Sequence, residues 1–381
     1  MTAERLKSVQ EYYFSKKLRE VAARIEDGKP VINMGIGSPD LPPHPAVTEA
    51  LQAGLSHPKA HMYQSYQGLP ALRAAIAAFY ATHYHSTINP QSEILPLMGS
   101  KEGIMHISMA FLNPGDQVLI PDPGYPTYAS VTKLVEAEAI PYALTAENHW
   151  QPDFEALEAL DCSKIKLMWI NYPHMPTGAK AHSETFNRLI AWAQRKEVLL
   201  VNDNPYSFVL NDAPESILSY PGAKAVAMEL NSLSKTFNMA GWRVGWLAGN
   251  STHVNAVLKV KSNMDSGMFY GLQQGAIAAL QLTNEWFSSL NAVYRQRRAK
   301  IEQLAQAMGV TFDPQSVGMF VWAKLPDDHR DAEQYIDHLL EEKNLFLAPG
   351  TIFGKQGQGY IRFSLCVPEE KINQAITRIK S

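Results

Sequence analysis

Five short apolar runs between residues 93 and 234 constrain the fold of this chain more than any other feature. The runs are EILPLM (93–98), QVLIPDP (117–123), KIKLMWINYP (164–173), EVLLVNDNP (197–205) and AVAMELNSLS (225–234). Runs that are apolar throughout, with helical periodicity in the intervening segments, indicate strands buried on both faces. They predict an α/β fold with a mostly parallel central sheet covered by helices on both faces. A sixth run, GWRVGWLAGN (241–250), follows so closely that we expect it to pair antiparallel.

Beyond about residue 275 the sequence changes to the pattern of a smaller α+β unit. A long amphipathic helix is predicted over residues 284–309, where a glycine ends it. Two predicted strands, GMFVWAKL (318–325) and GYIRFSLCV (359–367), are interleaved with predicted helices near residues 331–343 and 368–380.

The first 44 residues hold a predicted helix (4–27) and the loop GIGSPDLPPHP. We expect this segment to pack with the C-terminal unit or to bridge the two units. The chain has 381 residues, enough for one large and one small domain. The expected boundaries are residues 45–277 for the large domain and residues 1–44 with 278–381 for the small one.

The composition of the chain argues against several classes of function. The formal net charge is −3 and no basic run occurs, so neither nucleic acid nor a membrane surface is an expected partner. The N-terminal MTAERLKSVQEYYFSKK lacks the apolar core of a signal peptide, and no stretch is apolar enough to span a bilayer. Cys162 and Cys366 lie far apart in strand-like contexts, so no disulfide is expected. We expect a cytoplasmic protein.

Polar or turn-forming residues follow each of the five predicted strands, at the edge of a parallel sheet where ligands bind. These segments are GSKEG, PGYPTY, NYPHMPTG, DNPY and SLSK. GSKEG precedes a predicted helix whose free N–H groups suit an anion, most simply a phosphate. Simple helix capping is a second explanation of the same residues.

Asp203 follows an apolar run and falls at the mouth of the predicted sheet. A carboxylate in such a place is costly unless it is paired. Asp203 either caps a turn with Asn204 and Pro205, or it pairs with a cation that a ligand supplies. Tyr206 would point into the same mouth.

Lys235 stands among small hydroxyl residues, with no acidic neighbour in NSLSKTFNMAGWR. A lone lysine is usually a solvated side chain. At a strand end shared with Asp203, however, desolvation or a nearby cation would lower the pKa of the amine and make it a nucleophile. Ser232, Ser234 and Arg243 offer hydroxyls and a guanidinium that could hold a phosphate close by.

Arg362 lies between Ile361 and Phe363 in a predicted strand, where a guanidinium is unfavourable unless it binds an anion. Two explanations stay open for this arginine. It could bind a substrate carboxylate in a bidentate manner, or it could form a structural ion pair.

Two histidine pairs, His57/His61 and His83/His85, have spacings that a metal ion could use. No carboxylate or thiol completes either set, and both pairs fall in polar segments that we expect to be exposed. We therefore expect no metal site.

Together these residues resemble the pyridoxal-phosphate-dependent aminotransferases of class I/II, which have fold type I. The resemblance runs from about residue 12 to the C-terminus, and SLSKTFNMAGWRVG is its most specific motif. With GSKEG, this motif looks most like the branch that holds alanine and LL-diaminopimelate aminotransferases. The resemblance implies pyridoxal 5′-phosphate as cofactor, and amino-group transfer between an L-amino acid and a 2-oxo acid by a ping-pong mechanism.

The resemblance also implies roles around the cofactor ring. Lys235 would hold the cofactor aldehyde as a Schiff base and then move the proton between the substrate α-carbon and the cofactor. Asp203 would pair with the pyridine nitrogen and keep it protonated. Tyr206 would hydrogen-bond the phenolic oxygen of the ring, and Tyr125 would stack on the ring face.

Further roles concern the phosphate and the substrate. Tyr63 is similar to the tyrosine that crosses a dimer interface to the partner's phosphate, and Ser266 would act with it, so the resemblance implies a homodimer. Arg362 would bind the substrate α-carboxylate, with the backbone at Gly37 nearby. The residues implied to hold the phosphate within one chain are Ser100, Lys101, Ser232 and Arg243.

One position departs from the family pattern. The family usually has NPTG where this chain has MPTG, and that asparagine donates to the same phenolic oxygen as Tyr206. Here the position is Met175, which cannot donate. Either Asn171 takes over this role, or the oxygen has one donor fewer, which predicts a higher pKa for the imine and a higher pH optimum.

Two alternative functions stay open. A carbon–sulfur β-lyase of the same fold would use the same cofactor for β-elimination. A non-catalytic cofactor-binding regulator would carry an extra DNA-binding domain, for which the resemblance leaves no room. The sequence does not identify the preferred amino donor or the pathway.

Overall fold

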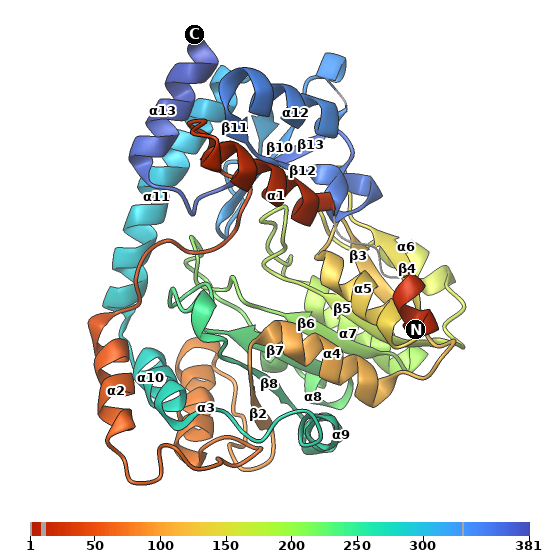
Figure 1. Cartoon of the computed structure of the whole chain (residues 1–381). Coiled ribbons are helices and arrows are strands. Elements are labelled where there is room, and N and C mark those ends of the chain that lie inside the picture. The colour runs from red at the N-terminus through yellow and green to blue at the C-terminus, as the bar shows by residue number, and fades with distance from the viewer. Residues whose placement is uncertain (1, 9–12, 330) are drawn as a thin grey trace.

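The computed structural model of the chain describes residues 2–8, 13–329 and 331–381. A seven-stranded sheet lies at the centre of its larger part (Figure 1), in the spatial order β2-β8-β7-β6-β5-β3-β4. Within this sheet only β8 runs against the other strands, which confirms both the mostly parallel sheet and the antiparallel sixth run. The strands are β2 (Ile94–Leu97), β3 (Gln117–Asp122), β4 (Glu138–Ala143), β5 (Ile165–Ile170), β6 (Leu199–Asp203), β7 (Ala227–Ser232) and β8 (Gly245–Gly249).

Strand β4 was not predicted from the sequence. It pairs only with β3 at the edge of the sheet, and most of its side chains are exposed or half-buried. An edge strand needs no apolar run and tolerates a proline such as Pro141, so the signal that marks the inner strands is missing here.

Helices cover both faces of the sheet, as the apolar strands predicted. Neighbouring residues of β5 show why the sequences of these strands are apolar throughout. Trp169 packs into the core on one face of the sheet, while Met168 and Ile170 pack into the core on the other face. The helices of the first core are α4 (Ser100–Phe111), α5 (Pro126–Leu134) and α9 (Ser251–Lys261). Those of the second core include α2 (Pro45–Leu55), α3 (Pro70–Tyr84), α7 (Thr185–Lys196) and α10 (Tyr270–Leu280). Two short helices, α6 (Phe154–Ala159) and α8 (Ala223–Val226), complete this part.

The smaller α+β part contains an antiparallel sheet in the order β12-β13-β10-β9. The two strands predicted here are confirmed as the neighbours β10 and β13. Its elements are β9 (Thr311–Phe312), β10 (Phe320–Lys324), α12 (Ala332–Lys343), β11 (Leu345–Phe346), β12 (Ala348–Pro349), β13 (Tyr360–Ser364) and α13 (Glu369–Lys380). They enclose a third hydrophobic core.

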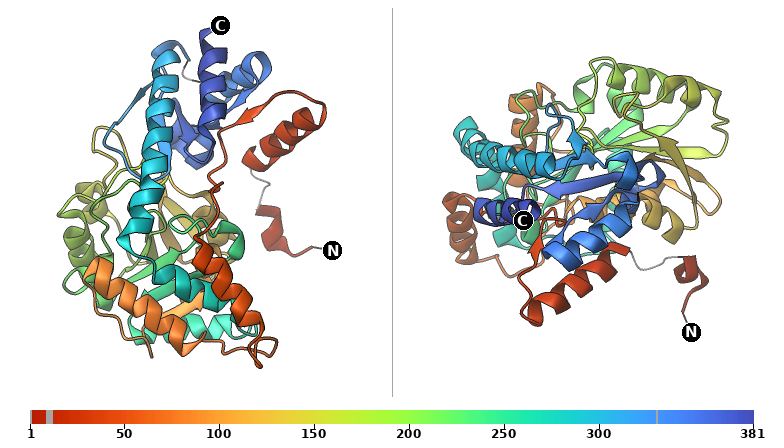
Figure 2. Two further views of the ribbon diagram at one scale, coloured as in Figure 1. Left: turned by 90° about the vertical axis from the view of Figure 1, so that its left-hand side faces the viewer. Right: turned by 90° about the horizontal axis from the view of Figure 1, so that it is seen from above.

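Helix α11 (Asn284–Ala307) extends along one side of the molecule, past both parts (Figure 2). Phe287, near its start, belongs to a core of the large sheet, whereas Tyr294 and Ile301 belong to the core of the smaller part. The helix predicted over residues 284–309 is therefore confirmed, and it contributes to both cores.

The N-terminal segment packs against C-terminal elements. Strand β1 (Ile32–Asn33) pairs in parallel with β11, and α1 (Tyr13–Glu26) lies beside α12. The prediction of one helix over residues 4–27 is wrong at its start, because Glu4–Ser8 form a 3₁₀ helix; residues 9–12 lie outside the described part. Residues 2–7 are exposed, so burial contributes little to the stability of an α-helix there. The domain boundaries near 44/45 and 277/278 stay a prediction.

Within the described ranges, no helix has both the length and the apolar character needed to cross a membrane.

Candidate active site

The carboxyl ends of the parallel strands open into a cavity of about 410 Å³. Most of the residues that the sequence singled out line it together, although they come from five separate strand ends. The side chains that border it include Ser100, Lys101, Tyr125, Tyr128, Asn171, Met175, Asp203, Tyr206, Ser232, Ser234, Lys235 and Arg243. This edge is where an α/β sheet binds its ligands.

Lys235 lies three residues after the end of β7 and borders this cavity. Its ammonium donates to the carbonyl oxygen of Gly37 at 2.5 Å, and no carboxylate of the described residues lies within ion-pair distance of it. Burial lowers the pKa of Lys235 to about 8, and the positive charges of Arg362 and Arg243 act in the same direction. The amine is therefore much closer to its reactive neutral form at neutral pH than a surface lysine is.

Asp203 is the last residue of β6 and is 5% exposed. Its Oδ2 accepts a hydrogen bond from the hydroxyl of Tyr128 at 2.9 Å, while its Oδ1 is buried and has no partner. Burial raises the pKa of this carboxyl to about 6. A buried acceptor without a donor is rare in proteins, so Oδ1 indicates a missing hydrogen-bond donor rather than a turn cap.

Tyr128 is a site residue that the sequence reasoning missed. Its ring stacks on Trp169 with centroids 5.0 Å apart, which aims the hydroxyl at Asp203. Tyr125, the N-cap residue of α5, comes three residues before Tyr128, and the two rings pack edge to face with centroids 5.7 Å apart. That spacing was the available signal, but only the sheet order brings α5 beside β6.

The start of α4 and the residues after β7 form a cradle for an anion. Gly99, with φ +91°, precedes Ser100, and no side chain caps the free N–H groups of this helix end. The guanidinium of Arg243 packs so closely on Gly99 that a Cβ there would collide with it. Ser232 and Ser234 border the same cavity. The lysine, the carboxylate and the anion cradle thus surround one space.

A second cavity of about 310 Å³ adjoins the first. Lys101, Tyr125, Met175, Tyr206 and Lys235 border both spaces. Gly37, a predicted substrate contact, lines the second cavity next to Phe320, whose ring leaves no room for a Cβ at that position.

Arg362 lies at the second cavity as a buried cation without an anion. Its Nη2 donates to the carbonyl oxygen of Gly35 at 2.7 Å, and its Nε is buried without a partner. The guanidinium lies 3.9 Å from the ring centroid of Phe320 and 4.6 Å from that of Phe353. Burial lowers the pKa of Arg362 to about 10. Because no carboxylate of the described residues pairs with it, the geometry favours a ligand anion over the structural ion pair.

The side chain of Asn171, which borders the larger cavity, is held by two neighbouring residues. Its side-chain oxygen accepts from the backbone N–H of Met175 at 2.8 Å, and its Nδ2 donates to the carbonyl oxygen of Asp203. The side chain of Asn171 therefore connects the end of β5 to the end of β6. The thioether of Met175 lies 3.5 Å from Nη1 of Arg362.

Tyr63 and Ser266 do not enter either cavity of their own chain. Tyr63 is 90% exposed and Ser266 is exposed as well. Their loops lie side by side, since the ring of His61 stacks on that of Phe269 and a Cβ at Gly267 would collide with Gln64.

Three of the four histidines singled out from the sequence, His57, His61 and His85, are exposed as expected, and His83 is not. His83 is half-buried against the rings of Phe79 and Phe208, which contradicts the prediction of an exposed segment; a polar flank in the sequence does not reveal the aromatic cluster. Elsewhere, Glu102, His106 and Asp265 bring ligand atoms within 4.8 Å of one another. The ammonium of Lys261, 2.8 Å from Asp265, already supplies a cation there.

The ends of the parallel strands thus bring together three features of a ligand site. They are a lysine without a carboxylate partner, a buried carboxylate with a free oxygen, and a helix N-terminus suited to an anion. The chain belongs to the aminotransferase class I and II family, whose model matches residues 29–379. The chain is thus an aminotransferase, and this family membership implies pyridoxal phosphate as the cofactor.

Named relatives and solved structures agree with this family. The chain is 39% identical to the LL-diaminopimelate aminotransferases of Aquifex aeolicus and Desulforudis audaxviator, with 100% and 99% of this chain and 98% and 97% of those proteins covered. Among solved structures it is similar to substrate-bound BacF from Bacillus subtilis (36% identity, TM-score 0.95, covering 100% of this chain and 97% of that one). It is also similar to an aminotransferase from Staphylococcus aureus (32% identity, TM-score 0.91, covering 100% and 98%).

Proposed function

We propose that pyridoxal 5′-phosphate binds in the larger cavity and that Lys235 is the residue through which this aminotransferase reacts. When bound, the cofactor supplies an aldehyde that links to amines and a protonated ring that stabilises negative charge at the substrate α-carbon. The observation that carries the proposal is the buried, unpartnered Oδ1 of Asp203 in a cavity shared with an unpaired lysine of pKa about 8. These residues fit the cofactor's ring nitrogen and aldehyde.

Lys235 and Asp203 would handle the two protons of the reaction. One is the proton of the substrate α-carbon, and the other is the proton on the ring nitrogen of the cofactor. The neutral Nζ of Lys235 would take the proton from the substrate α-carbon and later return it. A pKa of about 8 suits both directions of this transfer near neutral pH. Oδ1 of Asp203 would accept the N–H of the ring, while the hydroxyl of Tyr128 fixes Oδ2 and so orients the carboxylate.

The remaining residues of the site would bind and orient the cofactor and the substrate. Tyr125 and Tyr206, which border both cavities, would flank the ring. Arg362 would bind the α-carboxylate of the substrate through its free donors, with the carbonyl of Gly37 close to the substrate amine. The phosphate would lie among Ser100, Lys101, Ser232 and Arg243.

We also propose that the enzyme acts as a homodimer. Five large apolar side chains are exposed on the two adjacent loops that carry Tyr63 and Ser266: Met62, Tyr63, Tyr66, Met264 and Phe269. Such a patch favours an interface, and a second copy would cover it. In that arrangement Tyr63 and Ser266 would complete the phosphate site of the partner.

The hydroxyl of Tyr63 gives this arrangement a specific test. We expect Tyr63→Phe to stay dimeric but to bind pyridoxal phosphate ~10–100-fold more weakly, because a hydrogen bond to a charged group contributes ~1.5–3 kcal/mol. Fluorescence titration of apoenzyme measures the affinity, and sedimentation measures the dimer. A matched Tyr66→Phe variant should bind the cofactor normally. A Tyr63→Phe affinity equal to that of the unchanged protein contradicts the proposed contact.

The pKa of Lys235 predicts how covalent loading of the cofactor depends on pH. Only the neutral amine reacts, so the reactive fraction rises from roughly a tenth at pH 7 to roughly nine tenths at pH 9. We expect the loading rate of apoenzyme to rise about tenfold over this range and then level off. Stopped-flow absorbance measures the rate, and pyridoxine phosphate, which lacks the aldehyde, controls for binding. A loading rate that is flat across this range overturns the assignment.

Met175 predicts a measurable difference in the spectrum of the bound cofactor. Met175→Asn would restore a donor at the phenolic oxygen, and one additional hydrogen bond of ~1 kcal/mol lowers the spectral pKa of the bound cofactor by about one unit. A spectrophotometric pH titration measures it. Met175→Leu, which has no donor, should leave the midpoint unchanged. An unchanged midpoint in Met175→Asn would mean that another donor already serves the oxygen.

A half-reaction tests the proposed function itself. We expect mixing the holoenzyme with an amino donor to change the cofactor absorbance, and a 2-oxo acid such as 2-oxoglutarate to restore it. LL-diaminopimelate and alanine are the first donors to try, because the relatives above carry the former in their names. Release of ammonia and pyruvate from cystathionine, with no turnover of any donor with 2-oxoglutarate, would instead identify a carbon–sulfur lyase.

A further inference from the structure

We propose that the amino donor of this enzyme carries an uncharged, apolar side chain, either a ring or a branched aliphatic group. This inference rests on the proposed function and adds the substrate class to it. It departs from the name of the 39% identical relatives, because diaminopimelate carries a second ammonium and a second carboxylate at its far end.

The apolar wall of the second cavity carries the proposal. Once Arg362 binds the α-carboxylate and Lys235 faces the α-carbon, the remaining surface is mostly aromatic and aliphatic. It is supplied by four segments, namely α1, the loop before α5, β10 and the 3₁₀ turn after β12. Its side chains are Tyr13, Phe14, Tyr125, Phe320, Ile352 and Phe353.

The size of this cavity agrees with a side chain of moderate size. Its volume of about 310 Å³ is at the lower end of the range for ligand sites, and it must also hold the substrate carboxylate. Apolar surface buried on such a wall leaves water favourably, in proportion to its area. A ring or a branched aliphatic chain therefore gains affinity from the whole wall.

A distal ammonium would meet no anion among the described residues that line this cavity. No Asp or Glu borders it among the residues that the structure describes, and Asp203 borders only the larger cavity. Among the described lining residues, Lys101 is the one further cation besides Lys235 and Arg362. It could attract a distal carboxylate but would repel a distal ammonium. A buried charge without a partner is strongly unfavourable, so the wall selects against such donors.

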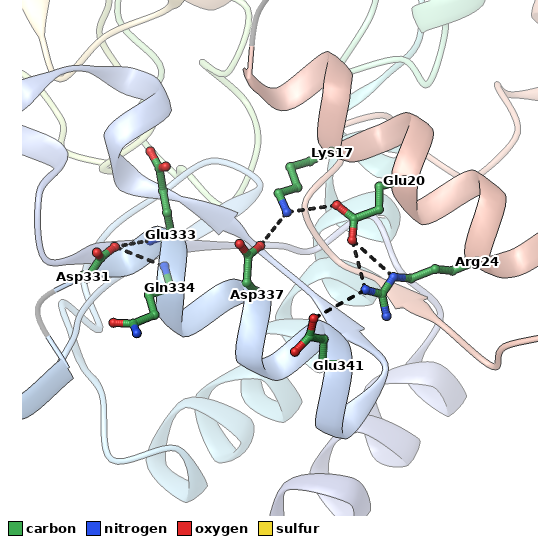
Figure 3. A network of polar contacts seen from close by, with 8 residues as sticks. All are labelled: Lys17, Glu20, Arg24, Asp331, Glu333, Gln334, Asp337 and Glu341. Atoms are coloured by element: carbon green, nitrogen blue, oxygen red, sulfur yellow. Dashed lines mark hydrogen bonds and ion pairs between the residues drawn. The ribbon is translucent and has the colours of Figure 1, made fainter.

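Acidic side chains of α1 and α12 lie outside the described lining of this cavity and have partners of their own. Asp337 of α12 lies 2.6 Å from the ammonium of Lys17 of α1, which also contacts Glu20 (Figure 3). Glu333 accepts a hydrogen bond from the hydroxyl of Thr351 at 2.7 Å. Glu20 and Asp337 thus hold α1 against α12 through Lys17, whereas Glu333 contacts Thr351.

The same contacts fix the position of Tyr13 and Phe14. Arg24 extends the network of Figure 3 between Glu20 and Glu341, one to two turns further along α1. Phe14 also stacks on Phe346 with centroids 6.0 Å apart. The hydroxyl of Tyr13 is buried without a partner, and burial raises the pKa of this phenol to about 12, so the side chain is neutral. The part of the wall that α1 supplies is thus held in place and carries no charge.

A donor panel tests the proposal on the holoenzyme. The first half-reaction is followed by absorbance with L-phenylalanine, L-leucine and L-methionine against LL-diaminopimelate and L-lysine. We expect kcat/KM for the best apolar donor to exceed that for LL-diaminopimelate by at least ~100-fold. A preference for LL-diaminopimelate overturns the inference but leaves the aminotransferase intact. If no amino acid changes the absorbance, the proposed function itself fails.

Equilibrium binding provides a readout that is independent of turnover. Calorimetry with 3-phenylpropionate, pimelate and 6-aminohexanoate compares a ring, a distal carboxylate and a distal ammonium on molecules that have no α-amino group. We expect 3-phenylpropionate to bind at least ~10-fold more tightly than 6-aminohexanoate. Equal or reversed affinities contradict the apolar wall.

Ile352 allows the wall itself to be changed. This side chain is half-buried, so a polar replacement can point into the cavity without disrupting a core. We expect Ile352→Glu to reduce the phenylalanine-to-lysine ratio of kcat/KM by ~10–100-fold, because the new carboxylate pairs with a distal ammonium. Ile352→Gln, of the same size but neutral, should change the ratio much less. If both variants keep the ratio of the unchanged enzyme, the wall does not determine specificity.

Discussion

Lys235→Ala is expected to lose at least ~10⁴-fold in amino transfer, the largest effect of any single substitution in this chain. The variant lacks both the amine that links to the cofactor and the base that moves the substrate proton, and general base catalysis alone accounts for ~10²–10⁴-fold. Turnover of the best donor with 2-oxoglutarate measures the loss. Circular dichroism should show an intact fold, because this side chain borders two cavities and donates only to Gly37.

An exposed lysine provides the matched control for this substitution. Lys371 lies on the surface of α13, far along the chain from the strand ends, and contacts Gln374. We expect Lys371→Ala to keep full activity. If Lys235→Ala keeps more than ~1% of the activity, the reactive amine has been assigned to the wrong residue.

Asp203→Asn is expected to change activity and stability in opposite directions. We expect kcat to fall ~10³-fold, because an amide cannot hold the ring nitrogen in its protonated form. The oxygen of the new side chain can still accept from the hydroxyl of Tyr128, so the local geometry should persist. Tyr128→Phe, which removes that donor but keeps the carboxylate, should cost only ~10-fold.

The raised pKa of Asp203 predicts how this residue makes the stability of the apoenzyme depend on pH. Its folded-state pKa of about 6 is above the ordinary value of 3.8, so the folded state disfavours the ionised form. The resulting stability loss develops as the pH rises from about 4 to about 6 and is complete above that range. Removing the charge should therefore raise the unfolding free energy of the apoenzyme at pH 7–8, by at most ~3 kcal/mol. Urea titrations measure it, and an apoenzyme that the substitution destabilises at pH 8 contradicts the buried unpaired carboxylate.

Much of the fold was predictable because each inner strand is buried on both faces. In β5, Met168 and Trp169 pack into different cores, so the strand shows an apolar run that a sequence reveals. Strand β4 lies at the edge and lacks this signal. The 3₁₀ turn at Glu4–Ser8 was missed because local propensity favours a helix where no packing supports one.

The candidate site was predictable to the extent that it lies at strand ends. Asp203 and Lys235 follow apolar runs directly, so the parallel sheet alone brings them to one edge. Tyr128 and Tyr13 belong to helices, and their side chains border the cavities only because elements distant in sequence pack together. Periodicity carries no information about such contacts, which is why the wall of the second cavity emerged only from the structure.

The most direct test of the account is to find where the cofactor attaches. Protein loaded with pyridoxal phosphate is reduced with borohydride, which fixes the link to the amine, then digested and mapped by mass spectrometry. We expect one modified peptide per chain, with the pyridoxyl group on Lys235. Modification of another lysine such as Lys101, or no stable modification at all, would contradict the central claim.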